Sequence, residues 1–149
     1  PDVQYFLTSN AVWDTIEHEN FLSEINAKLK KAGIRTSLFL DPSVAMVDGA
    51  AKIGVDRIEL YTEAYASLFL ADKIKAIESY KVAADYAVSV GLGVNAGLDL
   101  DLSNLNYFTT KIPQVEEVSI GHALVCDALY LGLENTIQMY LRASGKFRK

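Results

Sequence analysis

Hydrophobic and polar positions follow a pattern that repeats along the chain. The three stretches that show it are KKAGIRTSLFLD, AKIGVDRIELYT and YAVSVGLGVNAG. Each ends an amphipathic segment, places a glycine and then enters an apolar run. A glycine between a helix and a strand is typical of a helix-to-strand connection. A fourth apolar run follows Pro113, so the pattern predicts four strands, at about 35–40, 57–61, 92–96 and 117–120.

Helical periodicity fills the intervals between these runs. The helices that it predicts cover about 20–32, 43–53, 70–90, 102–110 and 123–141, with Gly132 as a candidate break point in the last. Strands that alternate with helices pair in parallel. Four such units suit either a small open doubly wound sheet or half of an eight-stranded barrel.

The two faces of the predicted strands differ in polarity. With a period of two, one face is aliphatic and carries Leu38, Leu40, Ile58, Leu60, Val94, Ala96, Val118 and Ile120. The other face is mostly polar and carries Ser37, Phe39, Glu59, Asn95 and Ser119. An open sheet with helices on both sides would be apolar on both faces. The difference favours an α/β barrel, or part of one, with an aliphatic outside under helices and polar groups lining the mouth.

Composition narrows the possible partners. The 149 residues are 50% hydrophobic, which suits a single domain (1–149) with a buried core. A net charge of -5 argues against a nucleic-acid partner, because binding to phosphate backbones needs clustered Lys and Arg. One cysteine and two histidines offer no zinc quartet. Neither a membrane-spanning run nor a signal peptide is evident, so a cytoplasmic protein that does not bind membranes is expected.

The candidate chemistry lies in the loops that follow the strands, where ligands bind in barrels and open α/β sheets alike. Gly121 and His122 stand where the last strand gives way to a helix, so backbone N–H groups and the positive end of the helix dipole would face an anion. The preceding loop, NAGLD, is also built of small residues. Two adjacent loops of this kind favour a phosphate site, although Gly-His at a helix start is equally compatible with a tight turn bearing a surface histidine.

Two further positions invite both a structural and a functional interpretation. Glu59 is a carboxylate in the middle of a strand, which is costly to bury unless it is paired or functional. It either forms an internal salt bridge with Arg35 or Arg57, or it stabilises a charged intermediate. The opening stretch TSNAVWDT either caps the segment that follows it through Thr8, Ser9 or Asn10 or forms a loop over the mouth.

Taken together, five motifs resemble one family. TSNAVWDT, GIRTSLFLDP, DRIELYTEAYA, the GLGVNAG stretch with the DLDL that follows Leu98, and VSIGHALVCDALYLGLENTIQMYLR resemble the pyridoxine 5'-phosphate synthases of vitamin B6 biosynthesis. The resemblance runs in order along nearly the whole chain. Members of that family are complete (β/α)8 TIM barrels of greater length. The resemblance therefore implies that this chain covers about the C-terminal half of such a barrel, with four βα units.

The resemblance also implies a reaction and a set of site residues. The family condenses 1-deoxy-D-xylulose 5-phosphate with 3-amino-2-oxopropyl phosphate to pyridoxine 5'-phosphate, phosphate and water, with no metal or organic cofactor, and its members form homo-oligomers. Carried over by position, Glu59 is the transition-state stabiliser. Thr8 contacts the deoxyxylulose phosphate, and Asp99 stands at a substrate-binding position. Gly121 and His122 bind the aminoacetone phosphate.

Two departures from the family pattern set the alternatives. Leu98 occupies the position of the proton-donating histidine of the NAGH motif, and leucine cannot transfer a proton. The family's other catalytic histidine and glutamate belong to the half that this chain does not cover. The sequence therefore predicts a synthase that Leu98 and the missing half impair, with a non-catalytic phosphate-binding half barrel or scaffold as the alternative. A weaker third possibility is an unrelated phosphate-handling barrel such as an isomerase or aldolase.

Overall fold

Four parallel strands form one sheet in the order β1-β2-β3-β4. The structure is a computed structural model, and it describes residues 11–145. The strands are β1 (Ser37–Leu40), β2 (Arg57–Tyr61), β3 (Gly93–Gly97) and β4 (Val115–Ser119). Each strand is joined to the next through a helix, as the alternating pattern predicts.

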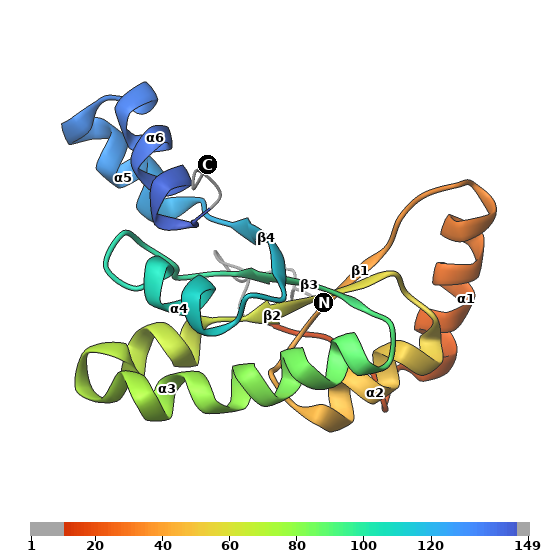
Figure 1. Cartoon of the computed structure of the whole chain (residues 1–149). Coiled ribbons are helices and arrows are strands. Elements are labelled where there is room, and N and C mark those ends of the chain that lie inside the picture. Colours follow the sequence, from red (N-terminus) through yellow and green to blue (C-terminus); the bar gives the residue numbers. More distant parts are fainter. Residues whose placement is uncertain (1–10, 146–149) are drawn as a thin grey trace.

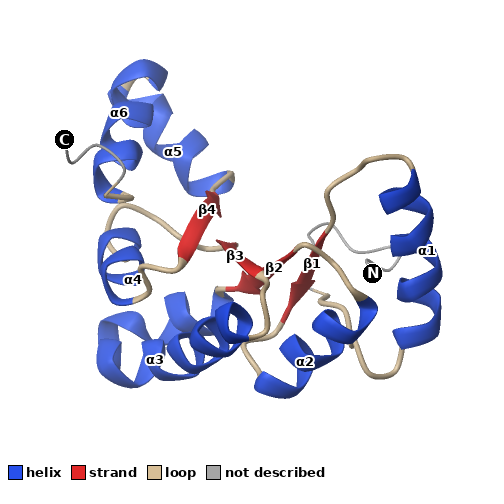
Figure 2. Ribbon diagram, turned by 45° about the vertical axis from the view of Figure 1, so that its right-hand side comes forward, coloured by secondary structure: helices blue, strands red, loops and turns tan. Residues whose placement is uncertain are grey.

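Helices cover one side of this sheet. They are α1 (Glu19–Lys31), α2 (Val44–Ile53), α3 (Glu63–Ser89), α4 (Leu105–Lys111), α5 (His122–Leu131) and α6 (Leu133–Ala143). Helices α1 to α4 lie around the sheet on its outer side, and α5 and α6 extend beyond β4 (Figures 1 and 2). The arrangement is that of consecutive βα units of a barrel whose circle is left open between β1 and β4. Within residues 11–145, no helix is both long and apolar enough to cross a membrane.

The aliphatic face of the strands forms the core, as predicted. Leu40, Ile58, Leu60, Val94 and Ala96 are completely buried beneath the helices. Val118 and Ile120 of the last unit are partly buried against the same core. Burying these side chains contributes roughly 1.5–3 kcal/mol for each large aliphatic group, which explains why the period-two pattern sets the facing of the sheet.

The opposite, inner face carries a network of ion pairs and hydrogen bonds between side chains. Arg57 lies across β3, donating to Glu116 Oε2 at 2.6 Å and to Asn95 Oδ1 at 3.1 Å. Gly93 makes this path available, because a Cβ at that position would come within 2.9 Å of the Arg57 Cγ. The network links the amino-terminal ends of β2, β3 and β4, away from the strand ends where a ligand would bind.

The last strand starts earlier than the sequence predicts. The expected span was 117–120, whereas β4 runs over Val115–Ser119. Val94 pairs with Val115 but Asn95 pairs with Glu117, so one residue of β4 is extra at this point. A β-bulge of this kind interrupts the period-two alternation. The apolar pattern becomes regular only after the bulge, which is where the prediction placed the strand.

The longest helix also begins earlier than expected. The prediction placed it at 70–90, whereas α3 spans Glu63–Ser89 with a non-helical residue, Asp72, inside it. The Asp72 Oδ1 accepts a hydrogen bond from the Lys75 N–H at 3.0 Å, as an N-cap does. The expected helix is therefore the segment that restarts at Asp72, and the turns from Glu63 are an added segment. The break predicted at Gly132 is confirmed, because α5 and α6 meet there.

Buried tyrosines fix the junction between β2 and α3. The Tyr80 hydroxyl donates to the Tyr61 carbonyl at 2.8 Å and accepts from the Tyr65 N–H at 3.2 Å. Both Tyr65 and Tyr80 are almost fully buried, and their rings pack edge-on at 5.9 Å. Burial raises the pKa of Tyr80 to about 12. A single phenol group thus ties the end of a strand to the start of the helix that follows it.

Replacing Tyr80 by phenylalanine should lower the free energy of unfolding by about 1–3 kcal/mol, because it leaves the Tyr61 carbonyl and the Tyr65 N–H without partners in the core. Urea denaturation measures the effect, and Tyr107→Phe is a matched control, since no hydrogen bond of its hydroxyl is found in the described chain.

The stability of the parent chain should also depend on pH, because the pKa of Tyr80 is about 10 in the unfolded chain and is raised to about 12 in the folded chain. Stability should therefore fall between these values, and less steeply in Tyr80→Phe. Equal losses in the two variants would contradict this role.

Candidate functional site

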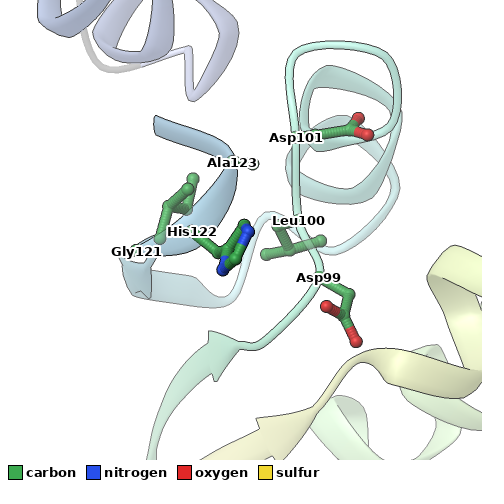
Figure 3. A pocket seen from close by; sticks show the side chains of 7 residues that line it. Asp99, Leu100, Asp101, Gly121, His122 and Ala123 are labelled. Atoms are coloured by element: carbon green, nitrogen blue, oxygen red, sulfur yellow. The ribbon is translucent and has the colours of Figure 1, made fainter. Parts of the chain in front are cut away.

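A pocket of about 200 Å³ opens between the β3–α4 loop and the start of α5. The residues that line it are Asp99, Leu100, Asp101, Ile120, Gly121, His122 and Ala123. The His122 ring points toward Leu100 across the pocket, whereas the carboxylates of Asp99 and Asp101 turn away from it (Figure 3). The two loops that the sequence identified as a candidate phosphate site thus meet at one place.

The start of α5 supplies one wall of the pocket. Gly121 is the N-cap residue, and no side chain among residues 11–145 caps the helix, so within this part of the chain its first N–H groups are left for a ligand or for water. Gly121 is exposed, and a Cβ at that position would meet nothing within 4 Å. A helix N-terminus without a capping side chain attracts anions through its free N–H groups and its dipole.

The opposite wall follows an unusual turn. Leu98 and Asp99 have φ values of 78° and 57°, and they are the two non-glycine residues with positive φ among those described. The left-handed conformation costs roughly 1–2 kcal/mol for a side-chain-bearing residue such as leucine. The turn is therefore strained at Leu98, the position to which the sequence resemblance gives a proton donor, and it must be held by its surroundings.

Two buried side chains hold the carbonyl groups of this turn. The Thr62 hydroxyl contacts the carbonyls of Gly97 and Leu98, and the Thr62 N–H also donates to the Gly97 carbonyl at 3.0 Å. From the other side, the Asn104 Nδ2 donates to the Asp99 carbonyl at 3.2 Å. The Asn104 Oδ1 accepts from the Asp101 N–H at 3.0 Å. Three successive carbonyls are thereby fixed.

Negative charge collects at the strand ends. Burial raises the pKa of the Tyr61 hydroxyl, and the charges of Glu63, Asp99 and Asp41 raise it further. Glu63 follows β2, Asp99 follows β3 and Asp41 follows β1. The Asp101 carboxylate is already engaged, because it accepts hydrogen bonds from the N–H groups of Ser103 and Asn104 at the start of α4. The Asp99 carboxylate accepts no such bond within the described residues.

Glu59 lies on the inner face of β2, next to the turn. Its half-buried carboxylate packs directly against Gly97, at a place that a Cβ on Gly97 would fill. The Cβ of Ser119, on the neighbouring strand β4, lies 3.0 Å from the same point. Gly97 thus provides the space that the carboxylate occupies, one residue before Leu98.

The salt-bridge interpretation of Glu59 finds no support. Arg35 pairs with Glu117 at 3.1 Å, and Arg57 pairs with Glu116 at 2.6 Å. Within residues 11–145, Glu59 takes part in no ion pair or hydrogen bond. A half-buried carboxylate in the middle of a strand with no cationic partner among the described residues is unusual and invites a functional interpretation.

The structure therefore groups the predicted site residues unevenly. Asp99, Gly121 and His122 line one pocket, whereas Glu59 stands beside the turn that leads into it. Thr8 lies outside the described residues. Sequence reasoning missed Thr62 and Asn104. The available signal for Thr62 was its position directly after the strand that carries Glu59. Asn104 lies inside the helix predicted at 102–110, whereas the structure makes it the N-cap residue before α4.

The described part of the chain offers no metal centre. Across residues 11–145, no group of three or more His, Cys, Asp or Glu side chains is placed to hold a metal ion. The chemistry that the pocket can perform is anion binding through backbone N–H groups and His122, with Glu59 nearby as a fixed negative charge.

Comparisons with known proteins agree on one family. The family described as "Pyridoxal phosphate biosynthesis protein PdxJ" matches residues 1–146. A relative from Cytophaga hutchinsonii named pyridoxine 5'-phosphate synthase is 63% identical over 142 residues, which cover 95% of this chain and 60% of the relative. Relatives of the same name from Christiangramia forsetii and Bacteroides fragilis are 51% and 52% identical, with 95% and 94% of this chain covered and 60% and 59% of the relatives. The chain thus spans about 60% of the length of the curated relatives it matches.

Replacing Gly97 by alanine should destabilise the chain by about 1–3 kcal/mol, because the added methyl group collides with the Glu59 carboxylate and presses on Ser119. Urea denaturation measures the loss. Gly121→Ala is the matched control and should stay within about 0.5 kcal/mol, since its Cβ meets open space.

The double variant Glu59→Ala/Gly97→Ala separates the collision from a backbone effect. Removing the carboxylate should recover most of the loss caused by Gly97→Ala, so that the two changes are not additive. Strict additivity would show that the Glu59 carboxylate does not rest against Gly97.

Proposed function

Because the chain belongs to the PdxJ family of pyridoxal phosphate biosynthesis proteins, we propose that it forms the phosphate-binding half of a pyridoxine 5'-phosphate synthase. The reaction condenses 1-deoxy-D-xylulose 5-phosphate with 3-amino-2-oxopropyl phosphate to pyridoxine 5'-phosphate, phosphate and water. In this proposal, residues 1–149 are one domain that supplies the four C-terminal βα units of a TIM barrel.

The observation that carries the proposal is the meeting of two loops at one pocket. The uncapped start of α5 faces the left-handed turn after β3, and Gly121 and His122 lie across from Asp99 and Leu100. Both walls present backbone N–H groups at the carboxyl ends of strands, which is where barrel enzymes commonly bind phosphate. We assign Gly121, His122 and the backbone of Asp99 to the phosphate of 3-amino-2-oxopropyl phosphate.

Glu59 takes the role of transition-state stabiliser in this proposal. Its carboxylate has no ion-pair partner within the described residues and packs against Gly97, one residue before the turn that leads into the pocket. A fixed negative charge of this kind stabilises positive charge that develops on a nitrogen-containing intermediate. Thr8 is assigned to the deoxyxylulose phosphate on the family resemblance alone.

Leu98 is expected to slow the proposed reaction, because the proton-transfer step lacks its general acid. It occupies the position of the family's proton donor, and its aliphatic side chain can neither give nor accept a proton. General acid catalysis contributes typically 10²–10⁴-fold to a rate. The proposed synthase is therefore slow in the step that this acid serves, even when the rest of the barrel is complete.

A second candidate function is phosphate binding without catalysis. The same substitution favours it, since the pocket walls are kept while the acid is absent. The strand ends around Tyr61 also carry the acidic groups Asp41, Glu63 and Asp99, which would repel a phosphorylated substrate. Full activity would need positive groups from the remaining 40% of the family's length.

Assembly is part of the proposal. Among the described residues, β1 and β4 are the edge strands of the sheet. Large apolar side chains on α5 and α6 are exposed: Val125, Leu129, Tyr130 and Leu133. Unpaired strand edges and apolar patches of this kind are normally covered in the working protein. We propose that the rest of the barrel closes the edges and that closed barrels associate as a homo-oligomer.

The proposal is tested in a completed barrel, made by joining this chain to the N-terminal part of the Cytophaga hutchinsonii relative. Leu98→His should raise the formation of pyridoxine 5'-phosphate from both substrates by about 100-fold or more, because it restores a general acid. Chromatography of the product measures the rate. Leu98→Asn is the control, since it adds polarity without a titratable group.

The outcomes distinguish the two candidate functions. Activity that returns only with Leu98→His supports a synthase in which one residue is impaired. If both substrates bind but neither variant forms product, the binding function is favoured and the synthase proposal fails.

Neutralising Asp99 should strengthen phosphate binding. Asp99→Asn removes a negative charge from the pocket rim, so the affinity of the chain for inorganic phosphate should rise about two- to fivefold at low salt and less at high salt. Isothermal titration calorimetry measures it. Glu134→Gln on α6 makes the same change in net charge away from the pocket, and an equal gain there would mean that the effect is not local.

A further inference from the structure

The strained turn at the pocket depends on groups that neither the resemblance nor the comparisons assign to the site. Leu98 and Asp99 adopt left-handed conformations that their side chains disfavour. Such a conformation persists only when neighbouring groups determine it. The contacts of the three carbonyls from Gly97 to Asp99 show which groups these are.

Thr62 holds the first two of these carbonyls. The Gly97 carbonyl accepts from the Thr62 N–H at 3.0 Å and lies 2.7 Å from the Thr62 Oγ1. Because the backbone N–H already serves Gly97, the hydroxyl proton is available to the Leu98 carbonyl, which the same oxygen contacts. Thr62 is completely buried, so water cannot replace this contact without rearrangement.

Asn104 holds the third carbonyl and the chain that follows. It is 3% exposed, and both polar atoms of its amide are used, by the Asp99 carbonyl and by the Asp101 N–H. Its own carbonyl accepts from the buried Tyr65 hydroxyl at 2.8 Å. Tyr65 in turn belongs to the junction that Tyr80 secures, so the turn is anchored in the core of the protein.

The direction of these contacts fixes the direction of the N–H groups. In a trans peptide the carbonyl and the following N–H point opposite ways, and no described peptide is cis. The carbonyls of Gly97, Leu98 and Asp99 point to Thr62 and Asn104. The N–H groups of Leu98, Asp99 and Leu100 therefore point away from those side chains, and Asp99 and Leu100 line the pocket. The carbonyls that Thr62 and Asn104 hold thus set the direction of the N–H groups of the turn, and backbone N–H groups in a turn can bind an anion.

We propose that Thr62 and Asn104 are positioning residues that set the turn from Leu98 to Leu100 before an anion binds. Neither residue lines the pocket, so each acts through the backbone that it holds. The identity of the anion as a phosphate rests on the proposed function, whereas the conformation of the turn does not.

The test compares Thr62→Val, which removes the hydroxyl but keeps the shape and the backbone N–H, with Thr62→Ser, which keeps the hydroxyl. In the ligand-free chain, three-bond couplings and backbone ¹³C shifts in NMR report φ at Leu98 and Asp99. Thr62→Val should shift these values away from the left-handed range and weaken binding of inorganic phosphate about fivefold. Thr62→Ser should retain the couplings and bind within about twofold of the parent chain. Asn104→Ala should alter the couplings at Asp99.

A purely structural role would lower stability and leave both readouts of the folded protein unchanged, and that result would overturn the proposal. If the parent chain binds no phosphate but Thr62→Val still releases the turn, the positioning role holds and the phosphate function fails. If the parent chain binds phosphate and Thr62→Val changes neither the couplings nor the affinity, the phosphate function holds and the positioning role fails.

Should Thr62→Val fail to fold, the double variant Thr62→Val/Leu98→Gly keeps the proposal testable. Glycine adopts a positive φ without help, so folding should return if the hydroxyl serves to hold Leu98. A double variant that remains unfolded would contradict the proposal.

Discussion

The burial of one aliphatic sheet face is the constraint on which the rest of the structure depends. Leu40, Ile58, Leu60, Val94 and Ala96 all point outward beneath helices α1 to α4, and this fixes which residues point inward. Because side chains alternate along a strand, Glu59 and Asn95 must lie on the inner face. The polar inner face is thus a consequence of the apolar outer one. It is divided between an ion network at the amino-terminal ends of the strands and the candidate site near their carboxyl ends.

The candidate site depends on the same core through a chain of hydrogen bonds. Tyr80 ties the end of β2 to the start of α3, Tyr65 reaches from α3 to the carbonyl of Asn104, and Asn104 holds the turn after β3. Thr62, between β2 and α3, grips the same turn from the other side. These donors and acceptors are buried, where an unmade hydrogen bond is costly, so the turn is kept in a conformation that its residues would not adopt alone. The pocket owes its shape to the core beneath it more than to the residues that line it.

The chain belongs to the PdxJ family, and two features of its described residues bear on the proposed function. Leu98 puts an aliphatic group in the strained turn after β3, at the position to which the proposed function gives the proton donor. The charged groups that act on Tyr61 at the strand ends, Glu63, Asp99 and Asp41, are all acidic. Anion binding through backbone N–H groups survives both features, because it depends on conformation and not on side-chain charge.

The sequence alone determined the strands, their facing and the two loops of the candidate site, because each of these is written in local periodicity and in the positions of glycines. The sequence did not predict the bulge in β4 or the early start of α3, since each depends on strand pairing or helix capping that only the folded chain supplies. It also left Glu59 between two interpretations, and the structure decided against the salt bridge by placing Arg35 and Arg57 on other partners. The roles of Thr62 and Asn104 were likewise decided only by tertiary structure. The Thr62 hydroxyl contacts carbonyls that lie 35 and 36 residues away in the sequence. Asn104 contacts a carbonyl of the strained turn. No local sequence pattern indicates which carbonyl a buried side chain will contact.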